Sequence, residues 1–296
     1  MSARVLIVTP VRNEATHIER VARSVAAQTR RPEAWVVVDD GSDDGTLERL
    51  RSLEAEIPFM TLLAAPAAED APDRLAVAAE ARAFNWALRG LELSSFTHVG
   101  KLDGDIELPP DYFERLLAEL AQNARLGVAG GTLIEPCGER WRPIRIPRHH
   151  VHGALKLYTL PCFTAIGGIQ ERLGWDTIDE TYARMHGFET HSYLELVARH
   201  HRPRASTGGR LRGHARHGEC AWIVRYGPGW VALRAFKMAL ERPLGVSGLA
   251  FLWGYFGAAV RRRPKVEDAE FRRFTRRELR RRMRRPLRAL LPRPAR

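Results

Sequence analysis

The chain has 296 residues, of which 45% are hydrophobic and 28% charged, so it can bury a substantial core, and wholesale disorder is excluded. Its 47 basic and 35 acidic residues give a net charge of +12. Residues 261–296, with 16 basic and 4 acidic residues, hold all of this excess, so the rest of the chain is electrically neutral overall and is followed by a basic tail. The three cysteines lie far apart and form no CxxC pair, which argues against a disulfide framework or a structural zinc site and favours a reducing compartment.

The first hundred residues alternate between strand and helix patterns. Short apolar runs predict buried strands at residues 5–8, 35–38 and 97–102. Apolar residues at helical spacing predict helices over residues 15–28 and 76–88, with a further helix opening near Thr46. The first apolar run is too short for a signal peptide. This alternation predicts an α/β fold with a doubly wound, mostly parallel sheet and helices on both faces.

The pattern changes after residue 225. Before that point, further helices are predicted at residues 109–120 and 177–185. Beyond it, two apolar helices and a basic helix are predicted at residues 230–240, 244–260 and 271–291. The uncharged stretch at 244–260 has 17 residues, just under the ~18–20 that a membrane-spanning helix needs.

Polar residues follow the predicted strands, at the edge where ligands of doubly wound sheets bind. Asp103-Gly104-Asp105 follows the third strand, and Asp39-Asp40 follows the second. Two carboxylates separated by one residue suit a hard divalent cation, which prefers oxygen ligands and can bridge to phosphates. A DxD sequence also occurs in solvated turns, but the second acidic strand end favours a site. Lys101, just before this pair, is expected to face solvent.

Three sequence blocks stand in a characteristic order: Thr9-Pro10-Val11-Arg12-Asn13-Glu14, then Val36-Val37-Val38-Asp39-Asp40-Gly41-Ser42-Asp43-Asp44-Gly45-Thr46, then Leu102-Asp103-Gly104-Asp105. In order and spacing they resemble the family 2 glycosyltransferases. Downstream, Ala165-Ile166-Gly167-Gly168 followed by Trp175-Asp176 resembles the acceptor-side block of that family, usually Gly-Gly and then Glu-Asp. The likeness covers roughly residues 4–225 and implies a GT-A-type, Rossmann-like fold that uses a nucleotide-diphosphate sugar.

The resemblance also implies residues for the donor site. The nucleoside pocket would be lined by Pro10, Glu14 and Asp40, with Thr9 and Ser42 as weaker candidates. Arg82 and Asn85 resemble a family block that borders the sugar nucleotide, although a solvated helix position explains Arg82 equally well.

A metal site follows from the same resemblance. Asp105, assisted by Asp103, would hold a divalent metal, Mn²⁺ or Mg²⁺, on the diphosphate. His214 or His217 is a candidate for an additional metal ligand, and the alternative for both is an ordinary histidine in a basic loop.

The resemblance further implies an inverting reaction, in which a carboxylate removes the proton of the acceptor hydroxyl. Asp176 is the favoured base, although Trp175 stands where the family usually has Glu. Asp179 and Glu180 are the alternatives, because residues three and four positions further along a helix share roughly one face with Asp176. Any of the three could instead be an acid that faces the dipole of a helix N-terminus.

These inferences together predict a metal-dependent, inverting hexosyltransferase of polysaccharide biosynthesis, acting on a lipid-linked or cell-surface glycan. Residues 1–227 would form the catalytic domain and residues 228–296 a helical, Arg-rich extension. We expect a cytoplasmic protein, attached peripherally to the anionic inner face of the membrane through this tail. The alternatives are a polyprenyl phosphate acceptor, a nucleic-acid-binding protein that uses the basic tail, and a non-catalytic scaffold.

Overall fold

The computed structural model of the chain describes residues 3–66, 73–202, 209–240 and 244–289, with the side chains of the last helix described as far as Met283. By its internal contacts the chain divides into two compact units, residues 1–203 and 204–296. The sequence placed this division between residues 227 and 228. The contact boundary lies earlier because helix α7 (Gly209–Ile223) packs closely on α9 (Val246–Val260) of the second unit.

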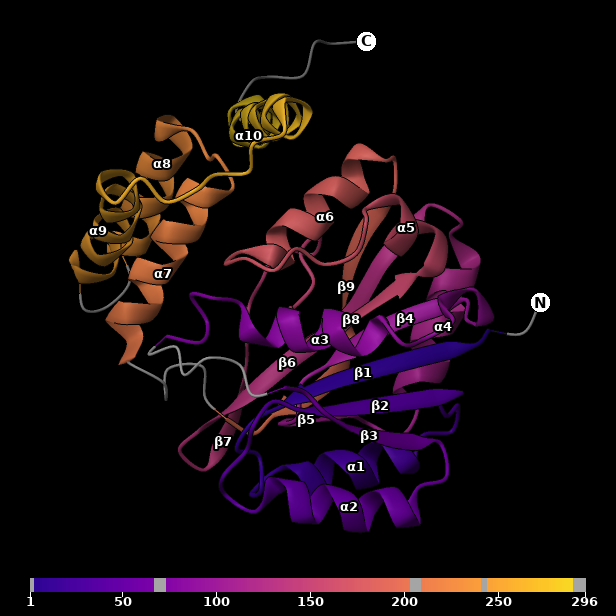
Figure 1. Ribbon diagram of the computed structural model, residues 1–296. Coiled ribbons are helices and arrows are strands. Elements are labelled where there is room, and N and C mark those ends of the chain that lie inside the picture. The colour runs from indigo at the N-terminus through magenta and orange to yellow at the C-terminus, as the bar shows by residue number, and fades with distance from the viewer. Residues whose placement is uncertain (1–2, 67–72, 203–208, 241–243, 290–296) are drawn as a thin grey trace. The chain divides into compact units, whose positions relative to one another are not determined.

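The first unit is built on a sheet that has nine strands in the described part of the chain, in the order β3-β2-β1-β4-β8-β6-β9-β5, with β7 paired to β6 (Figure 1). The strands are β1 (Val5–Val11), β2 (Ala34–Asp39), β3 (Met60–Ala64), β4 (His98–Leu102), β5 (Ile106–Glu107), β6 (Leu126–Cys137), β7 (Arg140–Pro143), β8 (Leu155–Thr159) and β9 (Glu189–His200). The helices are α1 (Ile18–Ala26), α2 (Thr46–Glu56), α3 (Ala79–Leu88), α4 (Tyr112–Gln122), α5 (Leu160–Ala165) and α6 (Trp175–Met185), with a short 3-10 turn at Leu93–Ser95. The predicted α/β fold class is confirmed.

Strands β3, β2, β1 and β4 are parallel, and their register aligns the strand ends that the sequence singled out. Pro10 of β1 pairs with Val38 of β2, and Val8 of β1 pairs with Lys101 of β4. Asp40 lies two residues after Val38, and Asp103 lies two residues after Lys101. The carboxyl edge of the sheet therefore gathers both acidic segments next to Pro10.

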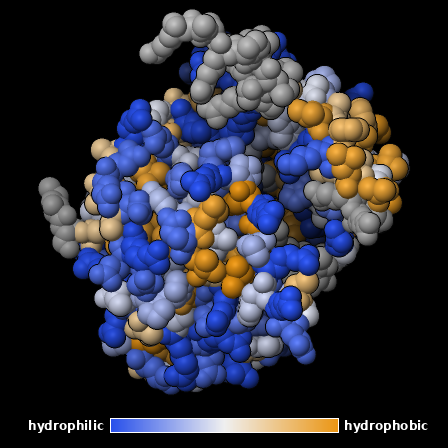
Figure 2. Space-filling view, turned by 180° about the vertical axis from the view of Figure 1, so that it is seen from behind, coloured by the Kyte–Doolittle hydropathy of each residue, from blue (hydrophilic) through white to orange (hydrophobic). Residues whose placement is uncertain are grey.

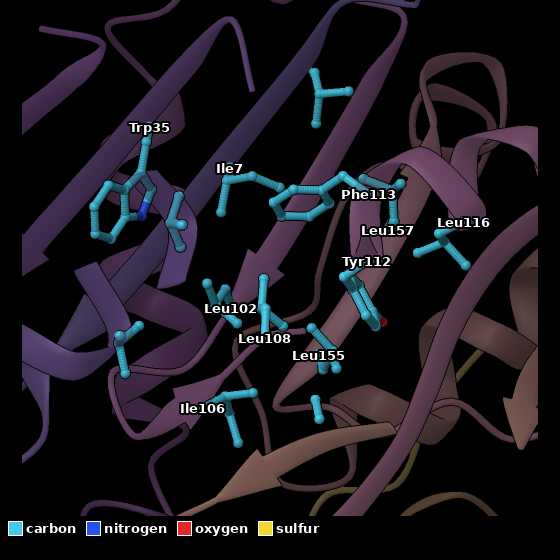
Figure 3. Close-up of a cluster of buried hydrophobic side chains, with 14 of the residues drawn as sticks. Ile7, Trp35, Leu102, Ile106, Leu108, Tyr112, Phe113, Leu116, Leu155 and Leu157 are labelled. Atoms are coloured by element: carbon cyan, nitrogen blue, oxygen red, sulfur yellow. The ribbon is translucent and has the colours of Figure 1, made fainter. Parts of the chain in front are cut away.

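Helices cover both faces of this sheet because the strands are apolar on both sides. Ile7 faces a core formed with α1, α2 and α4, while Leu6 faces a second core formed with α3, α5 and α6. Figure 3 shows the first of these cores, where the side chains of Trp35 and Tyr112 lie on the same side of the sheet as Ile7. Two fully packed faces leave the strand ends as the place where polar groups collect.

The second unit contains helices α7, α8 (Pro228–Ala239), α9 and α10 (Ala269–Ala289). Helices α7 and α9 pack backbone against backbone: a Cβ atom added at Gly254 would lie 1.7 Å from the carbonyl oxygen of Ala215. Phe271 and Leu279 of α10 are buried. In the ranges that the structure describes, no helix is both long and apolar enough to span a membrane.

Candidate active site

The turn that follows β1 is fixed by the loop that follows β2. Asn13 adopts a left-handed conformation with φ of 57°, which asparagine tolerates well. Its backbone N–H donates to Ser42 Oγ over 3.0 Å, and its side-chain amide donates to Asp43 Oδ1 over 2.8 Å. Ser42 therefore holds the loop in place, and the two strand ends form one rigid rim that presents Glu14.

Asp40 lies buried at this rim. Its backbone N–H donates to the carbonyl of Val11 over 2.9 Å, and its carboxylate forms an ion pair with Arg74. Burial raises the pKa of Asp40 above its usual range, although Arg74 and Arg12 oppose this shift. A buried carboxylate with one cationic partner can accept a further hydrogen bond from a ligand.

Glu14 is buried between the strand end that carries Asp40 and the segment Asp103-Gly104-Asp105. Arg202 donates to Glu14 Oε2 over 2.6 Å, and the backbone N–H of Glu14 donates to Thr46 Oγ1 over 2.8 Å. Burial, followed by the negative charge of Asp105, raises the pKa of Glu14 to about 8, and Arg202 offsets this only in part. Glu14 thus belongs to a crowded acidic cluster.

Asp105 is buried beside a histidine that the sequence analysis did not select. His200 Nε2 lies 3.2 Å from Asp105 Oδ2, because the antiparallel pairing of β5 with β9 sets Ile106 opposite His200. Burial opposes ionisation of Asp105, but His200 and Arg202 outweigh it and lower the pKa of Asp105. Among the described residues, Asp105 Oδ1 is a buried oxygen without a hydrogen-bond partner. That oxygen is available to a cation.

Asp103 has an internal counter-ion. Lys101 is fully buried rather than solvent-facing, which corrects the expectation from the sequence, and its ammonium pairs with Asp103 and, over 3.3 Å, with Glu80. The same ammonium donates to the carbonyl of Gly153 over 3.3 Å. Asp103 therefore already has a buried counter-ion, whereas Asp105 keeps one oxygen, Oδ1, without a hydrogen-bond partner in the described part of the chain.

The three candidate bases differ sharply in their surroundings. The side chain of Asp176 is 35% exposed in the first turn of α6, with His150 Nε2 4.0 Å from its carboxylate. Asp179 and Glu180 are buried and pair with the buried ammonium of Lys156 over 2.9 Å and 3.1 Å. Of the three carboxylates, only that of Asp176 is open to a substrate.

Trp175, at the position where the family usually has Glu, is buried and connects the start of helix α6 with the residues around Asp103. Its indole N–H donates to Glu80 over 3.0 Å. The ammonium groups of Lys101 and Lys156 lie 5.2 Å and 5.4 Å from its ring centroid, within cation–π range. The side chain beside Asp176 is thereby linked, through Glu80 and Lys101, to Asp103.

The remaining predicted residues lie in varied places. The Thr9 hydroxyl accepts from the indole N–H of Trp35 over 2.9 Å, inside the core. Asn85 donates to the carbonyl of Ile169 over 2.7 Å and so fixes the segment after the Gly-Gly pair, while Arg82 is exposed on α3. His214 and His217 lie on α7 of the second unit.

No described group of three His, Cys, Asp or Glu side chains forms a ready metal cage. The donor set around Asp105 nevertheless fits Mn²⁺ or Mg²⁺, because a buried, unpartnered carboxylate oxygen lies beside an imidazole. A cation held by few protein ligands is typical where substrate phosphates complete the coordination.

The amino-acid sequence matches a known protein family and a related protein. The Glycosyl transferase family 2 profile matches residues 6–169. The succinoglycan biosynthesis protein ExoA of Rhizobium meliloti (strain 1021) is 28% identical over 193 residues, which cover 56% of this chain and 53% of that protein, so the match spans about half of its length.

Two solved structures share the fold. The mannosyltransferase PcManGT from Pyrobaculum calidifontis, in complex with GDP-Man and Mn²⁺, superposes with a TM-score of 0.60 at 19% identity, over 98% of this chain and 83% of that one. GalNAc-T7 with UDP, GalNAc and Mn²⁺ superposes with a TM-score of 0.55 at 13% identity, over 87% and 57% of the two chains. At these identities the likeness establishes a shared GT-A-type fold and no more.

Proposed function

Because the chain belongs to glycosyl transferase family 2, we propose that it transfers a hexose from a nucleotide-diphosphate sugar to a lipid-linked or cell-surface glycan, with inversion at the anomeric carbon. The observation that carries this proposal is the gathering of Asp40, Glu14 and Asp105 at one edge of a parallel sheet, where nucleotides bind in folds of this kind. Family membership also weighs against the rival class, a nucleic-acid-binding protein.

The nucleoside of the donor would lie against the rim formed by Pro10 and Asp40. Asp40 can accept a hydrogen bond from a base imide or a ribose hydroxyl, and its ion pair with Arg74 favours the ionised form against the effect of burial. Ser42 would act indirectly, by holding Asn13 and the loop. Thr9 supports Trp35 beneath the rim rather than the ligand itself.

The diphosphate would bind near Asp105. Asp105 and His200 would hold the divalent metal, with Asp103 assisting, and the bound metal would neutralise negative charge on the leaving diphosphate. The guanidinium of Arg202 contacts two carboxylates here: it lies 3.9 Å from that of Asp105 and 2.6 Å from that of Glu14. A guanidinium at this place can also pair with a phosphate.

Asp176 would serve as the catalytic base. It would take the proton of the acceptor hydroxyl as that oxygen attacks the anomeric carbon, and the nucleoside diphosphate would leave from the opposite face. The exposure of Asp176 and the full pairing of Asp179 and Glu180 support this choice among the three. Asn85 would fix the acceptor side through the segment at Ile169.

The acceptor class is the next part of the proposal. One curated relative is named for succinoglycan biosynthesis, which is in keeping with a polysaccharide product. An acceptor that is already anionic, such as polyprenyl phosphate, would need no strong base. An Asp176→Asn variant distinguishes these two acceptors, because a glycan hydroxyl requires the base and a phosphate does not.

We further propose that the protein is cytoplasmic and attaches peripherally to an anionic membrane through its tail. Among the α10 side chains described, as far as Met283, the exposed arginines are Arg272, Arg273, Arg276, Arg277, Arg280 and Arg281. Each basic side chain near an anionic surface contributes about 1 kcal/mol. The inner face of the membrane would then keep the enzyme beside both its donor and a lipid-linked acceptor.

The direct test is a donor screen on the full chain. UDP- and GDP-hexoses are incubated with the protein with and without Mn²⁺, and the released nucleoside diphosphate is measured together with thermal stabilisation. We expect one donor class to respond, and Asp105→Ala to remove the Mn²⁺-dependent part of the stabilisation while the protein stays folded. Stabilisation that is equal in Asp105→Ala and in the wild type would contradict the metal assignment.

A further inference from the structure

The second unit exposes a continuous apolar face on α8 and α9. We call it the α8–α9 face, and it consists of Leu233, Phe236, Leu240, Leu244, Leu249, Trp253, Phe256 and Val260. Each of these side chains is between 54% and 83% exposed. Figure 2 shows hydrophobic residues gathered over this part of the surface. Exposed apolar patches formed by so many large side chains mark interaction surfaces.

The spacing of these residues places them on one side of each helix. Residues 249, 253, 256 and 260 of α9, and residues 233, 236 and 240 of α8 and its end, recur every three or four positions. The opposite sides are buried: Phe251 and Tyr255 of α9 pack with Val231 and Ala235 of α8. Helix α9 therefore has no charged side on either face, and α8 carries only Arg234 and Lys237 among its apolar residues, although one apolar side of each helix is enough inside the unit.

The basic helix α10 does not supply an apolar face of its own over its described side chains. Its apolar residues Phe271 and Leu279 are only 0% and 3% exposed. Their burial leaves the outward side of α10 to arginines. Within this unit the apolar and the basic surfaces thus come from different helices.

Within the described helices α8 and α9, the charged residues have one sign. Helices α8 and α9 contain no Asp or Glu, and Lys237, Arg261 and Arg262 are exposed on α8 and after α9. Two copies that met through this face would bring like charges together without acidic partners on either helix. An anionic partner that also accepts apolar side chains is complementary to it, and a bilayer with anionic lipids has both properties.

We propose that the α8–α9 face enters the interface of an anionic bilayer and is the main anchor of the protein, while the arginines of α10 bind lipid headgroups. This inference rests on the proposed membrane attachment and is independent of the catalytic assignments. Helix α9, with 15 residues, is about 22 Å long, shorter than the ~30 Å hydrocarbon core, so it would lie in the interface plane.

The test is flotation of the full chain with vesicles of phosphatidylcholine alone and of phosphatidylcholine with phosphatidylglycerol, at low and high salt. A variant with Leu249→Gln, Trp253→Gln and Phe256→Gln should lower the partition coefficient by about a hundredfold or more at both salt concentrations, because its loss is apolar. A second variant, Arg273→Gln with Arg277→Gln and Arg280→Gln, should lose mainly the preference for phosphatidylglycerol and its dependence on salt.

The control is Leu194→Gln with Val197→Gln, which removes two apolar side chains of the first unit that are 47% and 38% exposed and should leave flotation unchanged. Nucleoside diphosphate release from a donor sugar, measured without vesicles, should be equal in all variants and reports separately on the catalytic proposal. Flotation of the triple Gln variant at the wild-type level, or a wild type that binds neither vesicle, would overturn the inference. So would a wild-type dimer, measured by light scattering, that the same variant converts to monomers without loss of vesicle binding.

Discussion

Replacing Lys156 by methionine should destabilise the first unit strongly. The Lys156 ammonium is completely buried, pairs with Asp179 and Glu180, and donates to the carbonyl of Asp176 over 2.7 Å. Methionine fills a similar volume but leaves two buried carboxylates without their shared cation. Removing one partner of a buried ion pair typically costs about 3–5 kcal/mol.

The contacts that remain place the expected loss within that range. Glu180 keeps His150 at 3.0 Å and the backbone N–H of Val151 at 2.7 Å, and Asp179 keeps the hydroxyl of Tyr158. These donors offset part of the cost, and protonation of a carboxylate would relieve more of it. The loss should therefore shrink as the pH falls, because a buried, unpaired carboxylate has a raised pKa.

Urea unfolding followed by hydrogen exchange in peptides of β8 and α6 measures the effect on this unit. Adding Asp179→Asn to Lys156→Met should recover stability, with a coupling energy of about 2 kcal/mol or more. Lys237→Met, at an exposed lysine, is the matched control and should change stability by less than ~0.5 kcal/mol. A loss below about 1 kcal/mol for Lys156→Met would refute the assignment of Asp179 and Glu180 to a structural network.

Three further outcomes are expected. Glu14→Gln should flatten the pH dependence of stability in the metal-free protein. The pKa of Glu14 is raised from 4.5 to about 8, so stability that is present at low pH is lost as the pH rises from 4.5 through 8, by about 5 kcal/mol at most. A pH series of urea midpoints measures this loss, and an unchanged slope in the variant would contradict it. His200→Ala should weaken Mn²⁺-dependent donor binding by about 10–100-fold in calorimetric titrations, whereas equal affinity would remove His200 from the metal site. Gly254→Ala should destabilise the second unit by about 3 kcal/mol, since the new Cβ meets the backbone of α7, while Gly257→Ala on the same helix should be neutral or stabilising. Thermal melts that rank the two variants in the opposite order would be inconsistent with this packing.

Local patterns in the sequence were sufficient to predict the strands β1, β2 and β4 and the edge where they end. Buried parallel strands are short, apolar runs, and the residue after such a run must leave the sheet, so Asp40 and Asp103 could be assigned to one edge without a structure. The same reasoning predicted helix α6, because its apolar positions recur at helical spacing. Periodicity of this kind depends only on neighbours along the chain.

Contacts between distant segments decided the rest. Helical spacing placed Asp176, Asp179 and Glu180 on roughly one face, but Lys156 of β8 determines that two of them are buried in ion pairs. The sequence predicted that Lys101, near the end of β4, faces solvent. Its burial is made possible by two carboxylates, those of Asp103 and of Glu80 on α3.

His200 shows the same limit at the proposed metal site. It reaches Asp105 only through the pairing of β5 with β9, and the sequence separates these two residues by almost a hundred positions. No local pattern distinguishes it from His214 or His217, which the resemblance favoured. The tail follows the same rule, because whether the apolar residues of α10 or those of α9 face outward depends on which helix packs inside the unit. Burial of a charge or an apolar side chain is set by its tertiary partners, and these come from elsewhere in the chain.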